Sequence, residues 1–120
     1  MMAQILLAED DESMREFLAR ALRKAGHEVV AVGDGLDALA RLGEDNFDLL
    51  LADVVMPGLD GIEVARRATK KKPGMKVMFI TGFAAVALRA REQGPRDTRI
   101  LSKPFHLRDL VGEIGRLIAA

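Results

Sequence analysis

The 120-residue chain contains no cysteine, which excludes disulfides, cysteine-ligated metals and thiol catalysis. Tyrosine and tryptophan are also absent. The 18 basic and 18 acidic side chains leave no formal net charge, which argues against a nucleic-acid or membrane-surface binder. No apolar run approaches the roughly 20 residues that cross a bilayer, and no signal-peptide pattern is present. We therefore expect one cytoplasmic domain over residues 1–120, with no output domain.

Short apolar runs alternate with longer amphipathic segments along the chain. Each run is free of polar residues, which is typical of strands buried on both faces of a parallel sheet. The longer segments have helical spacing, and Phe17 and Leu36 belong to the apolar stripes of the first two. The expected strands are 5–8, 29–32, 49–52, 77–80 and 100–101. The expected helices are 14–25 before Gly26, 36–42 before Gly43, 62–72, 84–91, and 107 to the C-terminus. This alternation predicts a doubly wound α/β fold.

Polar residues follow four of the five expected strands. The carboxyl ends of parallel strands meet at one rim of the sheet, where ligands of such folds bind. We therefore expect these side chains to converge although they are far apart in sequence. They are Glu9, Asp10 and Asp11 after the first strand, Asp53 after the third, Thr81 after the fourth, and Ser102 and Lys103 after the fifth.

The acidic residues of this rim have two interpretations. Glu9, Asp10 and Asp53 would raise one another's pKa unless a cation relieved them. Oxygen ligands without histidine or cysteine suit Mg²⁺. Alternatively, the acids are solvated, and Asp10, Asp11 or Ser13 caps the first helix. The match of Asp53, Thr81 and Lys103 to neighbouring strand ends favours the metal site.

A carboxylate beside Mg²⁺ can act as a nucleophile towards a phosphoryl group and form an acyl phosphate. Asp53 is the candidate nucleophile. The charge on the transferred group needs donors, which the Lys103 ammonium and the Thr81 hydroxyl can supply. The pattern therefore indicates phosphoryl transfer to Asp53.

Four motifs together resemble the receiver domain of two-component response regulators, over essentially the whole chain. They are Glu9-Asp10, the run from Asp53 to Gly61, Thr81-Gly82, and Lys103-Pro104-Phe105. The resemblance implies a flavodoxin-like fold, with strand order 2-1-3-4-5 and five helices. It also implies that Asp53 accepts phosphate from a histidine kinase or histidine phosphotransferase.

The resemblance assigns the remaining site residues as well. Glu9, Asp10 and the backbone carbonyl of Val55 would hold Mg²⁺ together with Asp53, and Thr81 and Lys103 would contact the phosphoryl group. The peptide bond between Lys103 and Pro104 is expected to be cis. Asp60 is interpreted structurally, as part of a tight turn that leads into the third helix and places Asp60 near its N-terminus.

A narrower resemblance concerns residues 79–88 and 101–110, which are most similar to the CpdR type of receiver. These are single-domain receivers from alphaproteobacteria that are linked to the ClpXP protease. The implied function is a phosphorylation switch, not an enzyme, whose output is a separate protein such as ClpXP or its adaptors. The surface formed by the fourth helix, fifth strand and fifth helix would change partners.

Receivers usually carry an aromatic residue on the fifth strand, where this chain has Ile100. An aliphatic side chain offers no phenol, so the aromatic part of the family's switch is in question. Phe83 or Phe105 could take over part of this role, although core packing is the simpler interpretation of both.

Two other functions would use part of the same set of residues. A phosphatase or phosphotransferase with an aspartyl-phosphate intermediate needs an acid, but the residue two after Asp53 is Val55, which has no proton to give. A pure adaptor with a vestigial pocket would not need Asp53 at all, and the complete set of pocket residues argues against it.

Three remaining features have simple interpretations. The basic run 70–72 suits a solvated helix C-terminus better than a nucleic-acid site. His27 and His106 are too isolated in sequence to form a metal site. The pair Ala119-Ala120 is either a frayed helix end or an apolar tail that a protease could read as a degradation signal.

Overall fold

The computed structural model describes residues 2–119, in which five strands alternate with five helices. The strands are β1 (Gln4–Ala8), β2 (Glu28–Val32), β3 (Leu49–Asp53), β4 (Lys76–Thr81) and β5 (Arg99–Ser102). The helices are α1 (Glu12–Lys24), α2 (Gly35–Glu44), α3 (Gly61–Lys71), α4 (Ala84–Gln93) and α5 (Leu107–Ala119). All ten predicted elements are therefore present, with shifts of a few residues at their ends.

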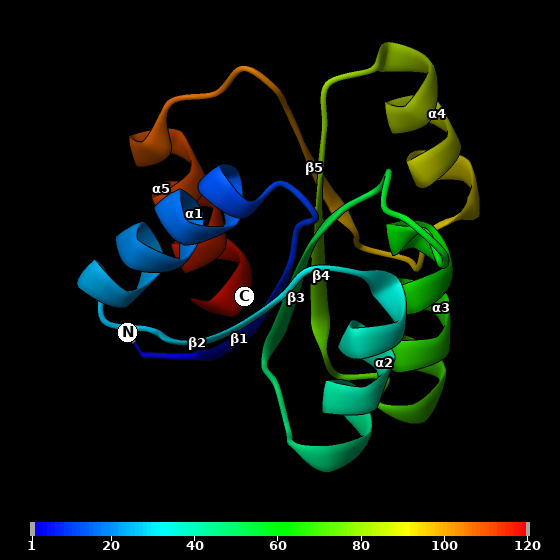
Figure 1. Ribbon diagram of the computed structural model, residues 1–120, viewed down its shortest axis with the longest axis horizontal. Coiled ribbons are helices and arrows are strands. Elements are labelled where there is room, and N and C mark those ends of the chain that lie inside the picture. The colour runs from blue at the N-terminus through cyan, green and yellow to red at the C-terminus, as the bar shows by residue number, and fades with distance from the viewer. Residues whose placement is uncertain (1, 120) are drawn as a thin grey trace.

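The strands form one parallel sheet in the order β2-β1-β3-β4-β5. Helices α1 and α5 cover one face, and α2, α3 and α4 cover the other (Figure 1). The predicted doubly wound fold and its strand order are confirmed. Because the order reverses between β1 and β3, the ends of these two strands frame the switch point where such folds bind ligands.

An apolar core fills the space on each side of the sheet. The central strand β3 is buried throughout, and β1 and β4 are buried except at their first residues. The prediction of burial on both faces is wrong for β2, which is mostly half-buried, and for β5, which is exposed at its two ends and half-buried between them. Both are edge strands, so each has a neighbouring strand on one side only.

Aspartates define where three of the helices begin. The side chains of Asp11, Asp34 and Asp60 accept hydrogen bonds from the backbone N–H three residues later, at 2.8–2.9 Å. Of the predicted caps of the first helix, Asp11 is the one used. After α1, Gly26 adopts a φ of 101°, which suits the glycine predicted there.

Three details of the predicted helices are wrong. Helix α2 does not end before Gly43 but continues to Glu44, since an exposed glycine inside a helix is tolerated at a cost of about 1 kcal/mol. Phe17 and Leu36 are 55% and 64% exposed, although they belong to apolar stripes. Their helices bury the neighbouring positions Leu18 and Ala38 instead.

Helix α5 extends through Ala119, while Ala120 lies outside the described residues, so the degradation signal stays a prediction. Among residues 2–119, no helix has the length and apolar character needed to span a membrane.

His27 is a buried polar residue between α1 and β2. Its Nδ1 accepts a hydrogen bond from the backbone N–H of Ala3 at 3.1 Å. Burial lowers the pKa of His27 below its ordinary value, because the charged imidazolium loses hydration inside the protein. The folded state therefore prefers the neutral imidazole.

We expect His27 to make the protein less stable as the pH falls. The unfolded chain binds the proton more readily, so the stabilisation is complete above pH ~6.5 and is lost progressively below it. A His27→Asn variant keeps an acceptor for Ala3 but cannot titrate. Urea unfolding at pH 7.5 and 5.5 should show a smaller difference for the variant. An equal difference in both proteins would contradict the assignment.

Candidate functional site

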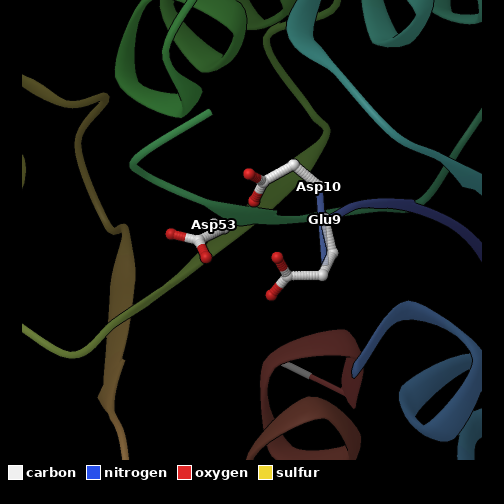
Figure 2. Close-up of side chains that lie close together, drawn as sticks. All are labelled: Glu9, Asp10 and Asp53. Carbon is white, nitrogen blue, oxygen red and sulfur yellow. The ribbon is translucent and has the colours of Figure 1, made fainter. Parts of the chain in front are cut away.

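The register of the central strands brings the first acidic residues together. Ala8 of β1 pairs with Ala52 of β3, so Glu9 and Asp53 follow at adjacent positions of the rim. Glu9 and Asp53 are buried, and Asp10 is exposed. Each of these three residues offers one carboxylate oxygen, and the three oxygens lie within 4.8 Å of one another (Figure 2).

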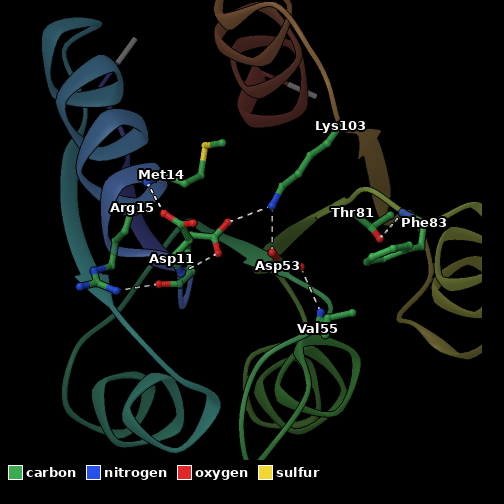
Figure 3. A network of polar contacts seen from close by, with 9 residues as sticks. Asp11, Met14, Arg15, Asp53, Val55, Thr81, Phe83 and Lys103 are labelled. Carbon is green, nitrogen blue, oxygen red and sulfur yellow. Dashed lines mark hydrogen bonds and ion pairs between the residues drawn. The ribbon is translucent and has the colours of Figure 1, made fainter.

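Lys103 reaches this acidic cluster from the segment after β5. Its Nζ lies 3.0 Å from Oδ2 of Asp53 and 3.3 Å from Oε1 of Glu9 (Figure 3). The peptide bond between Lys103 and Pro104 is cis, as the family resemblance implies. Burial lowers the pKa of Lys103, but hydrogen bonds and charges from Asp53 and Glu9 outweigh it, so that the pKa is raised overall. One ammonium thus neutralises part of the charge of two carboxylates.

Burial of Glu9 raises the pKa of its carboxyl group, and the nearby charge of Asp53 adds to the shift. The N–H of Asp11, at 3.1 Å, and the Lys103 ammonium both act in the opposite direction. The cluster would therefore be stabilised by an additional cation, and its carboxylate oxygens suit a hard one such as Mg²⁺.

Val55 and Thr81 are the other two predicted site residues, and both take part in hydrogen bonds at the rim. The backbone N–H of Val55 donates to Oδ1 of Asp53 at 3.0 Å, while the side chain of Val55 is exposed. Thr81 is buried at the end of β4, and its hydroxyl oxygen accepts the N–H of Phe83 at 3.2 Å (Figure 3). At the rim, Lys103 therefore contacts Asp53 directly, whereas the Thr81 hydroxyl is hydrogen-bonded to Phe83 at the start of α4.

Arg15 is a site residue that the sequence analysis missed. From α1, its Nη1 donates to the backbone carbonyl of Glu9 at 2.9 Å. This contact fixes the backbone between Glu9 and Asp10 and so helps to aim both carboxylates. A motif search does not reveal it because the acceptor is a carbonyl group; the only signal is an arginine four residues after the helix cap Asp11.

The aromatic residues near the rim only partly follow expectation. Ile100 is half-buried, pairs with Phe79 in the sheet, and packs against the core. Phe105 is also half-buried against the core, but Phe83 is 63% exposed, so core packing is the wrong interpretation of Phe83. Phe83 instead presents a large apolar surface at the start of α4.

Gly61 is required by the close approach of α3 to the end of strand β3. A Cβ at this position would overlap the carbonyl oxygen of Asp53 and lie 3.1 Å from Cα of Val54. A Gly61→Ala variant should therefore lose about 1–3 kcal/mol of unfolding free energy, because α3 must shift. At Gly115 in α5 a Cβ meets nothing within 4 Å, so Gly115→Ala should gain about 0.5–1 kcal/mol. Urea unfolding measures both, and equal effects would contradict the packing argument.

Comparison with known proteins identifies the family. Residues 5–115 match the response regulator receiver domain. This chain belongs to the response regulator receiver family. Membership places the receiver in two-component signalling, where such domains act as phosphoacceptors for histidine kinases or phosphotransferases and bind Mg²⁺ at an acidic pocket. In this receiver, Glu9, Asp10 and Asp53 form an acidic cluster at the rim of the sheet.

Among curated relatives, the receiver is 59% identical over 119 residues to the response regulator receiver protein CpdR of Brucella abortus (strain 2308). The match covers 99% of both chains, so the narrower resemblance to the CpdR type is also confirmed. The receiver is 39% identical over 118 residues to the response regulator protein FleR of Pseudomonas aeruginosa, covering 97% of this chain but 24% of that protein.

Solved structures confirm the fold. A response regulator receiver protein from Sinorhizobium medicae WSM419 superposes with a TM-score of 0.92 at 32% identity, covering 99% of this chain and 96% of the other. The chemotaxis protein CheY4 of Vibrio cholerae superposes with a TM-score of 0.86 at 27% identity, covering 98% and 99%.

Proposed function

We propose that this receiver is a single-domain phosphorylation switch of the cytoplasm, in which Asp53 takes a phosphoryl group from a phosphohistidine donor. The observation that carries the proposal is the contact of the Lys103 ammonium with both Asp53 and Glu9, at 3.0 and 3.3 Å. A cation held between two buried carboxylates is positioned to meet the negative charge of an incoming phosphoryl group. The set of residues also matches the family motif.

The same rim has the donor chemistry of a Mg²⁺ site. Glu9, Asp10 and Asp53 would hold the ion, together with the carbonyl of Val55. When bound, Mg²⁺ supplies positive charge that neutralises the phosphate oxygens. A hard ion with few protein ligands fits three carboxylates, of which Asp10 is exposed to solvent.

The chain's own residues account for the remaining chemistry. A carboxylate oxygen of Asp53 forms the new bond to phosphorus as the phosphorus–nitrogen bond of the donor breaks, and the electron pair returns to the imidazole nitrogen. The product is an acyl phosphate on Asp53. The Lys103 ammonium can then pair with a phosphoryl oxygen. The Thr81 hydroxyl can donate a hydrogen bond to another once its side chain turns away from the N–H of Phe83.

An exposed apolar hollow beside Lys103 suits the phosphodonor. Its volume is about 330 Å³, and it is lined by Met14, Phe17, Lys103, Pro104 and Phe105. Phe17 is 55% exposed there, although its helix buries other apolar residues. An apolar surface next to the reactive carboxylate would seat the helix that carries the donor histidine.

The proposed output is a separate protein, in line with the likeness to CpdR, with ClpXP protease or its adaptors as candidates. Helix α4, strand β5 and helix α5 would form the surface that changes partners. An enzyme acting on external phosphomonoesters is less well supported, because Val55 offers no acid beside Asp53.

Incubation with acetyl phosphate and Mg²⁺, followed by intact mass spectrometry, tests the proposal. We expect one phosphoryl adduct per chain, which a chelator prevents. Absence of an adduct in the presence of Mg²⁺ would reject the switch, and sustained turnover of an external phosphomonoester would favour the enzyme.

A further inference from the structure

Helix α4 is anchored more weakly than the other described helices. It fully buries one residue, Ala90, whereas each of the other four helices buries three or more. Its N-cap residue, Phe83, makes no side-chain capping bond. A helix with so little buried surface can move at a small cost in free energy, so the few polar contacts that hold it acquire more weight.

Two polar contacts attach α4 to the rest of the described chain near the rim. At its start, the N–H of Phe83 donates to the Thr81 hydroxyl oxygen at 3.2 Å. One and a half turns later, Nη1 of Arg89 lies 3.2 Å from Oδ2 of Asp60. The proposed function assigns Thr81 to the phosphoryl group, so a rotation of the Thr81 side chain towards that group would break this first contact.

Asp60 connects this second contact to the phosphoacceptor. Its Oδ1 caps α3 by accepting the N–H of Glu63 at 2.9 Å, which leaves Oδ2 for Arg89. The next residue, Gly61, packs against the carbonyl of Asp53 and donates its N–H to Val54 at 2.9 Å. Arg89 therefore ties α4 to the segment that begins at the phosphoacceptor and ends at the cap of α3.

We propose that Arg89 is a positioning residue. Its ion pair with Asp60 holds α4 in the position that the helix has in the unphosphorylated protein, and it thereby opposes phosphorylation of Asp53. The proposal rests on the proposed function. In this arrangement the Thr81 hydroxyl is engaged by Phe83, and Lys103 is paired with Asp53. If Thr81 turns to a phosphoryl group, α4 loses its first contact, and the ion pair is the contact that resists its displacement.

Two variants break the ion pair without touching the rim. Asp60→Asn keeps an oxygen to cap α3 but removes the charge, and Arg89→Gln removes the other partner. Arg91→Gln is the matched control, because Arg91 is exposed on the same helix and makes no ion pair within the described residues. Arg89→Lys should restore the wild-type behaviour in part, since it retains the charge.

Binding of beryllofluoride in the presence of Mg²⁺, followed by ¹⁹F NMR, is the first measurement. A half-exposed ion pair opposing the change should make each disrupted variant bind about two- to five-fold more tightly than the wild type. The double variant should bind no more tightly than either single variant. A loss of thermal stability without a change in affinity would indicate a merely structural pair and would overturn the proposal, as would weaker binding.

Amide hydrogen exchange of α4 without beryllofluoride is the second measurement. We expect faster exchange in both disrupted variants but not in Arg91→Gln. If the wild type fails to bind beryllofluoride at all, the proposed function is rejected, and exchange alone decides whether the ion pair holds α4. Unchanged exchange of α4 in both Asp60→Asn and Arg89→Gln would overturn the claim that the ion pair restrains this helix.

Discussion

An Asp53→Asn variant is expected to lose phosphorylation by at least about 10³-fold while the folded protein becomes more stable. The amide cannot form an acyl phosphate, so no route to the adduct remains at this position. Stability should rise because the charge of Asp53 contributes to the raised pKa of Glu9, after the larger effect of burial. With Asp53 neutral, Lys103 pairs with Glu9 alone, and the gain should be on the order of 1 kcal/mol.

The opposite signs of these two effects distinguish a functional acid from a structural one. Intact mass spectrometry measures the adduct, and urea unfolding at pH 7 measures the stability. Asp37→Asn is the matched control, because Asp37 is an exposed aspartate on α2 and its loss changes net charge equally. A variant at Asp53 that was both unphosphorylated and markedly less stable would show that the carboxylate mainly holds the fold together.

A Lys103→Met variant should slow phosphorylation by about 10²- to 10³-fold and destabilise the fold by about 2 kcal/mol. The methionine fills similar space but leaves Glu9 and Asp53 without their shared cation. Lys103 normally acts against the rise in the pKa of Glu9, so its loss raises that pKa further. A carboxyl group with a raised pKa takes up a proton on folding, so the variant should regain stability as the pH falls from 7 towards 5.

Mg²⁺ should also stabilise the Lys103→Met variant more than it stabilises the wild type, because the ion replaces a missing positive charge. Thermal unfolding with and without Mg²⁺ measures this difference. Lys24→Met serves as the control, since Lys24 is exposed at the end of α1, away from the rim. Equal stabilisation of all three proteins by Mg²⁺ would contradict a shared acidic site.

The sequence alone predicted the fold because its two strongest signals are local. Uninterrupted apolar runs mark the strands, and residues at helical spacing mark the helices between them. Once the strands are parallel, the residues that follow them must share a rim. Glu9, Asp53 and Lys103 could therefore be placed together although they are separated by up to 94 positions.

Other features depend on which neighbour covers a residue, and periodicity does not contain this information. The spacing of Phe17 and Leu36 fits an apolar stripe, yet both side chains are largely exposed. Gly43 could end a helix or continue it, and the buried Leu42 before it favours continuation. The contact of Arg15 with a carbonyl and the pair of Arg89 with Asp60 are single polar contacts set by tertiary packing.

Reduction of the phosphorylated protein with borohydride, followed by peptide mass spectrometry, tests the central claim most directly. An acyl phosphate on Asp53 would be converted to homoserine at that position. We predict homoserine at position 53 alone, formed only after treatment with acetyl phosphate and Mg²⁺. Homoserine at position 10 would identify Asp10 as the nucleophile, and the alcohol derived from glutamate at position 9 would identify Glu9; either product would contradict the assignment.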